Sequence, residues 1–440
     1  MRRGHDFEYR SRGRSRSSSW LLPDISWARF DWIVFGLAAF LLGTGLMFVK
    51  ACFDANLDYG RMDLSAGSPF RSHLKIVTIS TPVFLAGLYM RPVWLRKQSY
   101  LIYGAGIFGL SIAWSCVRRG ATVQVIDPYG VGAGSSGGVV GALAPHTPEN
   151  WNDKKQFQFE SLIMANRYWG AVEQAGGLST GYARSGRLQP INDDRALELA
   201  KTRRVGAKQL WQGLAEFEIV KAAGTWLPKS ESGLVIHDTL SGRMHPRMTC
   251  AALVAALASK GCDVVAEGAP DGIIVEATGW RGLLELAEQM EQPVGNGVKG
   301  QAAVLQFATA PNAPQLFADA LHIIPHSNGT VAIGSTSERL FDDPTSTDQQ
   351  LDDVVSRAKH AFPVLQNARV IERWAGVRPR SKSRAPMIGH HPIRKDAFIA
   401  NGGFKIGFGM APKIAEVMAD LILNGTDRIP EGFRPEASLR

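Results

Sequence analysis

The stretch LIYGAGIFGLSIAWSCVRRGATVQVIDPYG, residues 101–130, decides the fold class of this sequence. Its first apolar run ends in glycines, which is typical of a buried parallel strand. An amphipathic helix that is closed by Gly120 follows, and a second strand follows the helix. Gly104, Gly106 and Gly109 form a G-x-G-x-x-G pattern between the first strand and the helix. This order predicts a βαβ unit with a dinucleotide site at the helix N-terminus.

Each glycine of this pattern has its own expected role. Gly104 permits the tight turn, Gly106 lets the backbone approach a pyrophosphate, and Gly109 lets the helix pack on the strand. Asp127 ends the second strand, where a carboxylate can bind both hydroxyls of an adenosine ribose. An acid at this place argues against a cofactor with a 2′-phosphate.

A second glycine- and serine-rich loop, GVGAGSSGGVVGALAP, occupies residues 130–145, directly after the second strand. Its small residues and hydroxyl groups could line a pyrophosphate and a ribityl chain that run deeper than NAD would. A flexible loop without function would explain the composition but not the position. The loop therefore favours FAD over NAD.

The rest of the chain alternates helices and strands. Residues 153–177 predict one or two helices, and residues 244–279 predict a helix, a strand, a turn and a strand. Strand-like segments such as GLVIHD, QAAVLQF, LHIIPH and TVAIGST lie between and after them. We therefore predict an α/β fold, in which an FAD-binding Rossmann-type (GxGxxG) domain is interleaved with a mixed-sheet α+β domain.

The net charge of +9 belongs mostly to the N-terminal part, because residues 1–97 hold 14 of the 49 Lys and Arg but only 7 of the 40 Asp and Glu. The nearly neutral remainder lacks the basic face that phosphate backbones require, so no nucleic-acid partner is expected. The cysteines form no C-x-x-C pair, which predicts neither a metal site nor a disulfide framework. They are Cys52, Cys116, Cys250 and Cys262.

The N-terminal part reads as a membrane anchor. Residues 1–31 predict a basic disordered tail, and residues 32–49 carry no charge and are long enough to span a bilayer. Residues 76–90 contain Pro82 and form a weaker candidate span, for which a buried or interfacial helix is the alternative. Arginines flank both segments, so residues 32–97 predict a helical transmembrane hairpin with a linker. The predicted location is the inner (cytoplasmic) membrane, with the FAD domain facing the cytoplasm.

Residues 98 to about 424 resemble the D-amino-acid oxidase family of FAD-dependent oxidoreductases, especially its glycine oxidase and D-amino-acid dehydrogenase-like branch. Four blocks carry the resemblance in the order that the family has. They are IYGAGIFGLSIAWSCVRRG…VQVID with GAGSSGGVVGALAP, IIVEATGWRG, LHIIPHSNGTVAIGSTSE, and RWAGVRPRSKSRAPMIGHHP…FIANGGFKIGFGMAPKIAEVMADLI.

The resemblance implies two discontinuous domains with the flavin ring at their junction. The FAD domain would comprise residues 98–171, 241–290 and 376–424, the substrate domain residues 172–240 and 291–375, and a C-terminal tail residues 425–440.

Non-covalent FAD is implied as well, since no cysteine follows Cys262 to attach the flavin. The helix that begins at Gly407 would aim its N-terminus at the pyrimidine end of the flavin. The motifs and the resemblance together name the candidate cofactor-binding residues as Gly104, Gly106, Ile107, Phe108, Gly109, Asp127, Pro128, Ser135, Ser136, Gly141, Ala142, Leu143, Thr278, Gly279, Gly403, Ile406 and Gly407.

Three candidate catalytic residues follow from the same resemblance. Arg378 matches the arginine that binds the substrate carboxylate. His322 stands where glycine oxidases have a tyrosine, so it could donate a hydrogen bond, mark another substrate or only fill the core. Lys405 stands where that branch has a second arginine, and could stabilise the substrate carboxylate or reduced flavin, or be a solvated lysine. No metal ligand is expected.

The implied reaction is oxidation of the CH–NH bond of a small amine or amino acid, such as glycine, sarcosine or a D-amino acid. A hydride passes to flavin N5, water hydrolyses the imine, and oxygen or a membrane quinone takes the electrons. Ser383 departs from an acid that many members have. Together with His322 and Lys405 it leaves open a flavin-binding membrane protein with a degenerate amine site. A tRNA-modifying FAD oxidoreductase is the other alternative.

Overall fold

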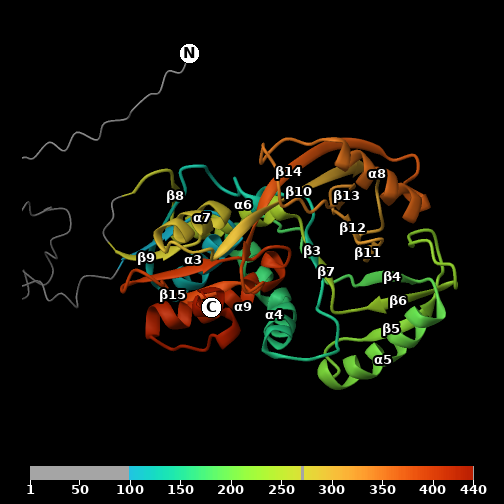
Figure 1. Ribbon diagram of the computed structural model, residues 1–440, viewed down its shortest axis with the longest axis horizontal. Helices are drawn as coiled ribbons and strands as arrows, with labels where there is room; N and C mark the ends of the chain where they lie inside the picture. Colours follow the sequence, from blue (N-terminus) through green and yellow to red (C-terminus); the bar gives the residue numbers. More distant parts are fainter. Residues whose placement is uncertain (1–98, 269–271, 440) are drawn as a thin grey trace, which may run out of the picture. The chain divides into compact units, whose positions relative to one another are not determined.

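Figure 1 shows a computed structural model of the chain, which describes residues 99–268 and 272–439. The predicted tail and hairpin of residues 1–97 lie outside these residues. Within the two described ranges, no helix is both long enough and apolar enough to cross a bilayer. The predicted location at the cytoplasmic membrane is accordingly corrected, because the described structure offers no helix that would place the protein there.

The first of two large sheets carries the βαβ unit that the glycine pattern predicts. β1 pairs in parallel with β2 and β9, β9 with β16, and β2 with β8, whereas β15 is antiparallel to β16. In their spatial order the six strands are β15 (Met387–His390), β16 (Ala397–Asn401), β9 (Ile273–Glu276), β1 (Ser99–Tyr103), β2 (Thr122–Ile126) and β8 (Val264–Val265).

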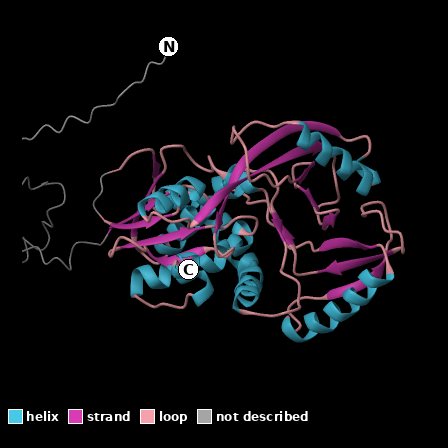
Figure 2. Cartoon of the chain, viewed as in Figure 1, coloured by secondary structure: helices cyan, strands magenta, loops and turns pink. Residues whose placement is uncertain are grey.

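Helices pack beside this sheet and build the largest core (Figures 1 and 2). Asn152 caps α4 by accepting from the backbone N–H of Lys155, and Gly177 ends it in the left-handed conformation, so residues 153–176 form one helix. The helices of this core are α3 (Ile107–Val117), α4 (Asp153–Gly176), α6 (Pro246–Ala258) and α9 (Gly407–Asn424). α7 (Gly279–Gln289) packs in a separate apolar cluster with Met387 and Ile399.

The expectation that α3 is amphipathic is wrong, because every residue of this helix is buried. β1 and β2 cover one side of α3, and α6 and α9 cover the rest. Fully burying a Leu, Ile or Phe side chain contributes roughly 1.5–3 kcal/mol, so the apolar IFGLSIAW run stabilises a central helix rather than a surface one.

The second sheet contains the strand-like segments that follow the βαβ unit. It is mixed, because β11 runs parallel to β4 while its other pairings are antiparallel. Its eight strands lie in the order β14 (Arg369–Ser381), β10 (Gly295–Gln306), β13 (Thr330–Gly334), β12 (Leu321–Pro325), β11 (Gln315–Ala318), β4 (Arg187–Ile191), β6 (Leu234–Asp238) and β5 (Phe217–Lys221).

Short elements complete the fold. α8 packs on β10, β12 and β13, and α5 packs on β5. β3 and β7 form a small two-stranded antiparallel sheet that belongs to neither large sheet. These elements are α5 (Asp194–Leu210), α8 (Gln349–Ala361), α10 (Glu436–Leu439), β3 (Ala142–Leu143), β7 (Gly242–Arg243), η3 (Ser135–Gly137), η4 (Pro363–Leu365) and η5 (Glu431–Phe433).

The two sheets interleave along the chain, as the order of predicted elements requires. Two elements cross the bounds expected for the domains: α4 runs to Gly176 and β14 is continuous through Ser381, whereas residues 171 and 376 were the predicted boundaries. The division into an FAD domain and a substrate domain remains a proposal with these adjusted limits.

Candidate active site

A cavity of about 520 Å³ is lined by residues from both sheets and from the loops that join them. All but four of the residues predicted for cofactor and substrate line it, including Arg378, His322 and Lys405. The four that do not line it are Gly104, Gly109, Pro128 and Leu143. Its volume lies in the range that small-molecule and cofactor sites occupy.

Gly104 and Gly109 do not line the cavity but permit the close backbone packing next to it. Gly104 has a φ of +109°, and a Cβ atom there would lie 2.3 Å from the carbonyl oxygen of Ala277. A Cβ on Gly109 would lie 1.9 Å from the carbonyl oxygen of Gly104. The two glycines thus permit the turn and the close approach of helix to strand, and neither needs to touch a ligand.

Two polar side chains hold the loop against the turn. The carboxylate of Asp127 accepts from the backbone N–H groups of Ala105 at 2.8 Å and Tyr129 at 2.9 Å. The hydroxyl of Ser136 accepts from the N–H of Ile107, in the first turn of α3, at 2.9 Å. Asp127 and Ser136 are therefore held at the wall of the cavity that the N-terminus of α3 reaches.

Three helices begin at this cavity without a side-chain cap from the residue that precedes them. These preceding residues are Gly106 before α3, Thr278 before α7 and Ile406 before α9, and all three line the cavity. Because the N-terminal N–H groups and the helix dipole attract negative charge, this wall suits a pyrophosphate and an electron-rich ring.

Arg378, on β14, projects into the other end of the cavity. Its guanidinium donates to the hydroxyl of Ser335 at 2.9 Å and to the carbonyl oxygens of Thr336 at 2.7 Å and Lys299 at 3.2 Å. Its Nε atom is buried without a partner, and none of its hydrogen-bond partners is a carboxylate. Burial lowers the pKa of Arg378 to about 10. The charge is thus available to an anionic ligand.

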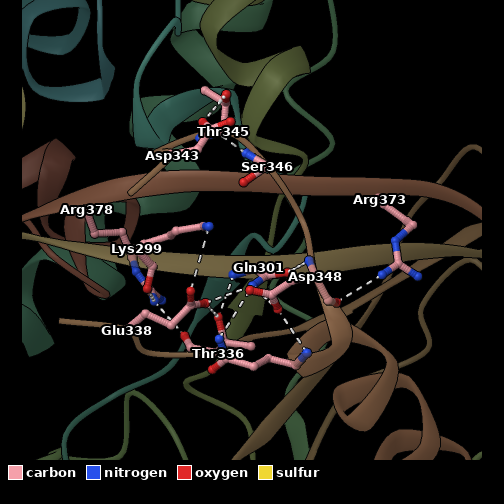
Figure 3. Close-up of polar contacts among 11 residues, drawn as sticks. Lys299, Gln301, Thr336, Glu338, Asp343, Thr345, Ser346, Asp348, Arg373 and Arg378 are labelled. Carbon is pink, nitrogen blue, oxygen red and sulfur yellow. Dashed lines mark hydrogen bonds and ion pairs between the residues drawn. The ribbon is translucent and has the colours of Figure 1, made fainter. Parts of the chain in front are cut away.

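A buried ionic network lies behind Arg378 (Figure 3). Nζ of Lys299 lies 3.8 Å from the carboxylate of Glu338, and both side chains are buried. Gln301 donates to Glu338 at 3.1 Å and to Asp348 at 2.8 Å, and the hydroxyl of Thr336 also bonds Glu338. This network holds in place the backbone at Lys299 and Thr336, whose carbonyl oxygens accept hydrogen bonds from the guanidinium of Arg378.

His322 and Lys405 also lie at this end. Burial, with the positive charges of Arg187 and Lys405, lowers the pKa of His322 to about 3, so its imidazole is neutral at ordinary pH. Burial and the neighbouring arginines lower the pKa of Lys405. Nζ of Lys405 and Cζ of Arg378 lie 5.7 Å and 5.5 Å from the centre of the Phe404 ring. His322 makes no hydrogen bond through its buried Nδ1 atom.

The cavity wall includes residues that the sequence did not single out. Arg187 comes from β4, outside every motif, and Gln158 comes from α4, where it accepts from the backbone N–H of His146 at 2.7 Å. Gly300 and Asn401 also contribute. Only folding brings these residues to the site, so no local signal could have identified them.

Comparison with known proteins identifies the family to which a cavity of this kind belongs. Residues 99–421 match the family described as "DAO: FAD dependent oxidoreductase". The chain belongs to this family of FAD-dependent oxidoreductases. A glycine oxidase of Pseudomonas putida is 26% identical over 78% of this chain and 100% of its own length.

Solved DAO-family structures share the fold at low sequence identity. A glycine oxidase from Bacillus cereus superimposes with a TM-score of 0.63 at 20% identity, covering 75% of this chain and 96% of its own. An L-proline dehydrogenase from P. horikoshii gives 0.64 at 21% identity, covering 77% of this chain and 97% of its own. Both confirm the α/β fold with mixed sheets.

FAD is the cofactor of the DAO family, and the residues present here fit it. The N-termini of α3 and α9, which the preceding residues do not cap, the glycine turn and the Asp127 carboxylate supply what a dinucleotide requires. The three described cysteines, Cys116, Cys250 and Cys262, are buried, and none of them lines the cavity. The protein is therefore an enzyme of this flavin-dependent family.

Proposed function

We propose that the protein oxidises the CH–NH bond of a small amine or amino acid, for which glycine, sarcosine and D-amino acids are the first candidates. The observation that carries this proposal is Arg378, a partly buried guanidinium without a carboxylate partner in a cavity whose other end suits FAD. An amino acid would place its carboxylate on this charge in a forked hydrogen-bonded pair.

When bound, FAD supplies the two-electron acceptor that takes the α-hydride of the amine at flavin N5. Arg378 orients the substrate by its carboxylate, which turns Cα towards the acceptor and lowers the entropy cost of the reaction. The neutral imidazole of His322 offers one more hydrogen bond to the substrate. The N-terminus of α9 and Lys405 stabilise negative charge that develops during the transfer. The imine product reacts with water to give the carbonyl compound.

The electron acceptor in this proposal is oxygen or a quinone. Reoxidation of the reduced protein by air-saturated buffer and by a soluble quinone, followed by absorbance, distinguishes the two. A rate with oxygen that quinone does not change would favour an oxidase, and slow reaction with oxygen but fast reaction with quinone would favour a dehydrogenase.

The decisive experiment is an anaerobic absorbance spectrum of the FAD-loaded protein, before and after addition of glycine, sarcosine and a mixture of D-amino acids. Bleaching of the flavin band establishes the reaction class. A flavin that no amine bleaches would instead indicate a binding protein with a degenerate amine site.

Arg378→Ala tests the anchor itself. We expect it to raise KM for an amino acid about 100-fold while FAD remains bound, because a charge-assisted bidentate contact is lost. Arg373→Ala is the matched control, since Arg373 lies on the same strand but pairs with Asp352 at the surface. An unchanged KM in Arg378→Ala would refute the assigned role.

A further inference from the structure

Arg187 is a buried arginine at the substrate end of the cavity, and the proposed function does not use it. Only 8% of the residue is exposed, and it lines the same cavity as Arg378 and His322. It comes from β4, at the point where β11 pairs with that strand. Burying a guanidinium is costly, so its position requires an explanation.

The ion pair with Asp238 offsets only part of the free-energy cost of burying the Arg187 guanidinium. Nε of Arg187 donates to Oδ2 of Asp238 at 2.9 Å, and Asp238 is fully buried. The two terminal nitrogens of Arg187 form no hydrogen bond with any described residue, and Asp238 therefore holds the guanidinium by its side. Arg187 lines the cavity and these two nitrogens are not among the enclosed atoms, so they are available to donate to a ligand there.

The neighbours of Arg187 connect it with the substrate end of the cavity proposed above. Its Cζ atom lies 5.8 Å from the centre of the Phe317 ring, and the rings of Phe317 and His322 lie 4.7 Å apart. The charge of Arg187 is among the causes that depress the pKa of His322. Arg187 and His322, whose Nδ1 atom is also unpaired, thus form one wall of the cavity.

The charges that line the cavity are unequal. Arg187, Arg378 and Lys405 are cationic, whereas Asp127 is the one acid among the described lining residues and lies at the dinucleotide end. Lys405 and Arg378 lie 5.7 Å and 5.5 Å from the centre of the Phe404 ring, and the charge of Arg378 helps to lower the pKa of Lys405, so Lys405 strengthens the first anion site rather than forming a second. A substrate with one carboxylate would leave the free side of Arg187 unmatched.

We infer that the substrate is an amine that carries two carboxylates, one bound by Arg378 and the other by the free side of Arg187. Asp238 is then a positioning residue that presents the two terminal nitrogens to the ligand. This inference rests on the proposed function for the oxidation step, but the recognition of two carboxylates can be measured without turnover.

Binding to the FAD-loaded full chain, measured by isothermal titration calorimetry, tests the inference with matched probes. Succinate and its monoamide, succinamate, have nearly the same shape and differ by one negative charge. We expect succinate to bind at least tenfold more tightly, because the second carboxylate gains charge-assisted hydrogen bonds. Equal affinities would overturn the inference.

Two variants assign the preference to Arg187. Arg187→Lys keeps a cation beside Asp238 but removes the forked donors, and should reduce the succinate preference about tenfold or more. Arg184→Lys is the control, because Arg184 is exposed, donates to the carbonyls of Thr239 and Leu214 and does not line the cavity. If both variants keep the same preference, Arg187 is not the second site.

A double variant guards against misfolding, since Arg187→Lys could disturb the buried pair. Arg187→Met with Asp238→Asn removes both charges together and should also abolish the succinate preference. Persistence of the preference in this variant would contradict the inference.

Turnover separates this inference from the proposed function. Racemic aspartate should reduce the flavin with a kcat/KM at least tenfold above that of racemic asparagine, and Arg187→Lys should diminish this ratio. If glycine bleaches the flavin but succinate shows no preference, the proposed function stands and the inference fails. If no amine bleaches the flavin, the proposed function fails, and the succinate titration still decides whether the cavity recognises two carboxylates.

Discussion

The guanidinium of Arg378 lies 2.7 Å from the carbonyl oxygen of Thr336, and the hydroxyl of the same Thr336 bonds the buried carboxylate of Glu338. Glu338 thus supports the backbone that binds Arg378 but forms no hydrogen bond or ion pair with its guanidinium (Figure 3). A direct ion pair would have neutralised the charge that a substrate carboxylate needs. The arrangement holds the anchor in place and leaves its charge available.

Gly300→Ala should displace Arg378 without removing it. A Cβ at residue 300 would lie 2.2 Å from Nη2 of Arg378, and the flexible guanidinium would have to move. We expect KM for an amino acid to rise about tenfold, with FAD affinity and melting temperature little changed. Gly170→Ala is the control, because nothing lies within 4 Å of a Cβ there. A KM equal to that of the control would show that the guanidinium tolerates the methyl group.

Glu338→Gln should destabilise the protein, because it leaves Lys299 buried without an anion. We expect the free energy of unfolding to fall by about 3 kcal/mol, measured by denaturant titration. Lys299→Met combined with Glu338→Gln should recover most of that loss. Should the single and double variants prove equally stable, Lys299 and Glu338 do not depend on each other.

Ser136→Ala should weaken FAD binding, because the N–H of Ile107 loses its hydroxyl acceptor and the loop loses its contact with α3. We expect the Kd of the apoprotein for FAD to rise about fivefold, measured by flavin fluorescence. Ser111→Ala is the control, since this buried hydroxyl has no hydrogen-bond partner. Equal Kd values for the two variants would contradict the role of Ser136.

FAD should leave the protein on acid precipitation, because no described cysteine lines the cavity. The yellow colour is expected in the supernatant, with the absorbance spectrum of free FAD. Flavin that stays with the precipitate would reveal a covalent bond.

The stability of the protein should fall as the pH drops below about 6.5. Burial and the neighbouring His245 and Arg243 lower the pKa of His326 to about 3, whereas a histidine in an unfolded chain has a pKa of about 6.5. The unfolded chain therefore takes up the proton first, and stability that is complete above pH 6.5 is lost progressively towards pH 3.

His326→Gln keeps a donor for the carbonyl oxygen of Val139 but cannot be protonated. Its melting temperature should decrease less between pH 7 and pH 4 than that of the unaltered protein, measured by differential scanning calorimetry. His360→Gln, at an exposed position of α8, is the control. If both variants lose stability in parallel, the buried His326 is not the titrating group.

Several predictions made from local patterns agree with the structure, and their limits have a physical cause. The strands and the helix around Gly104 and Gly109 form where the glycine pattern places them, because the turn is determined within a few residues. The amphipathic character expected for α3 was wrong, since burial on all sides depends on α6 and α9, which are distant in the sequence.

The sequence by itself determined the family and the dinucleotide end of the cavity. That end is built from a strand, a turn, a helix and an acid that lie close together in the chain, so local backbone geometry is enough to create it. Only the tertiary structure decided the substrate end. Arg187, His322 and Arg378 lie on three strands of one sheet, and their order follows from pairings such as that of β11 with β4. Such non-local pairings depend on which apolar faces pack together, and no short motif records them.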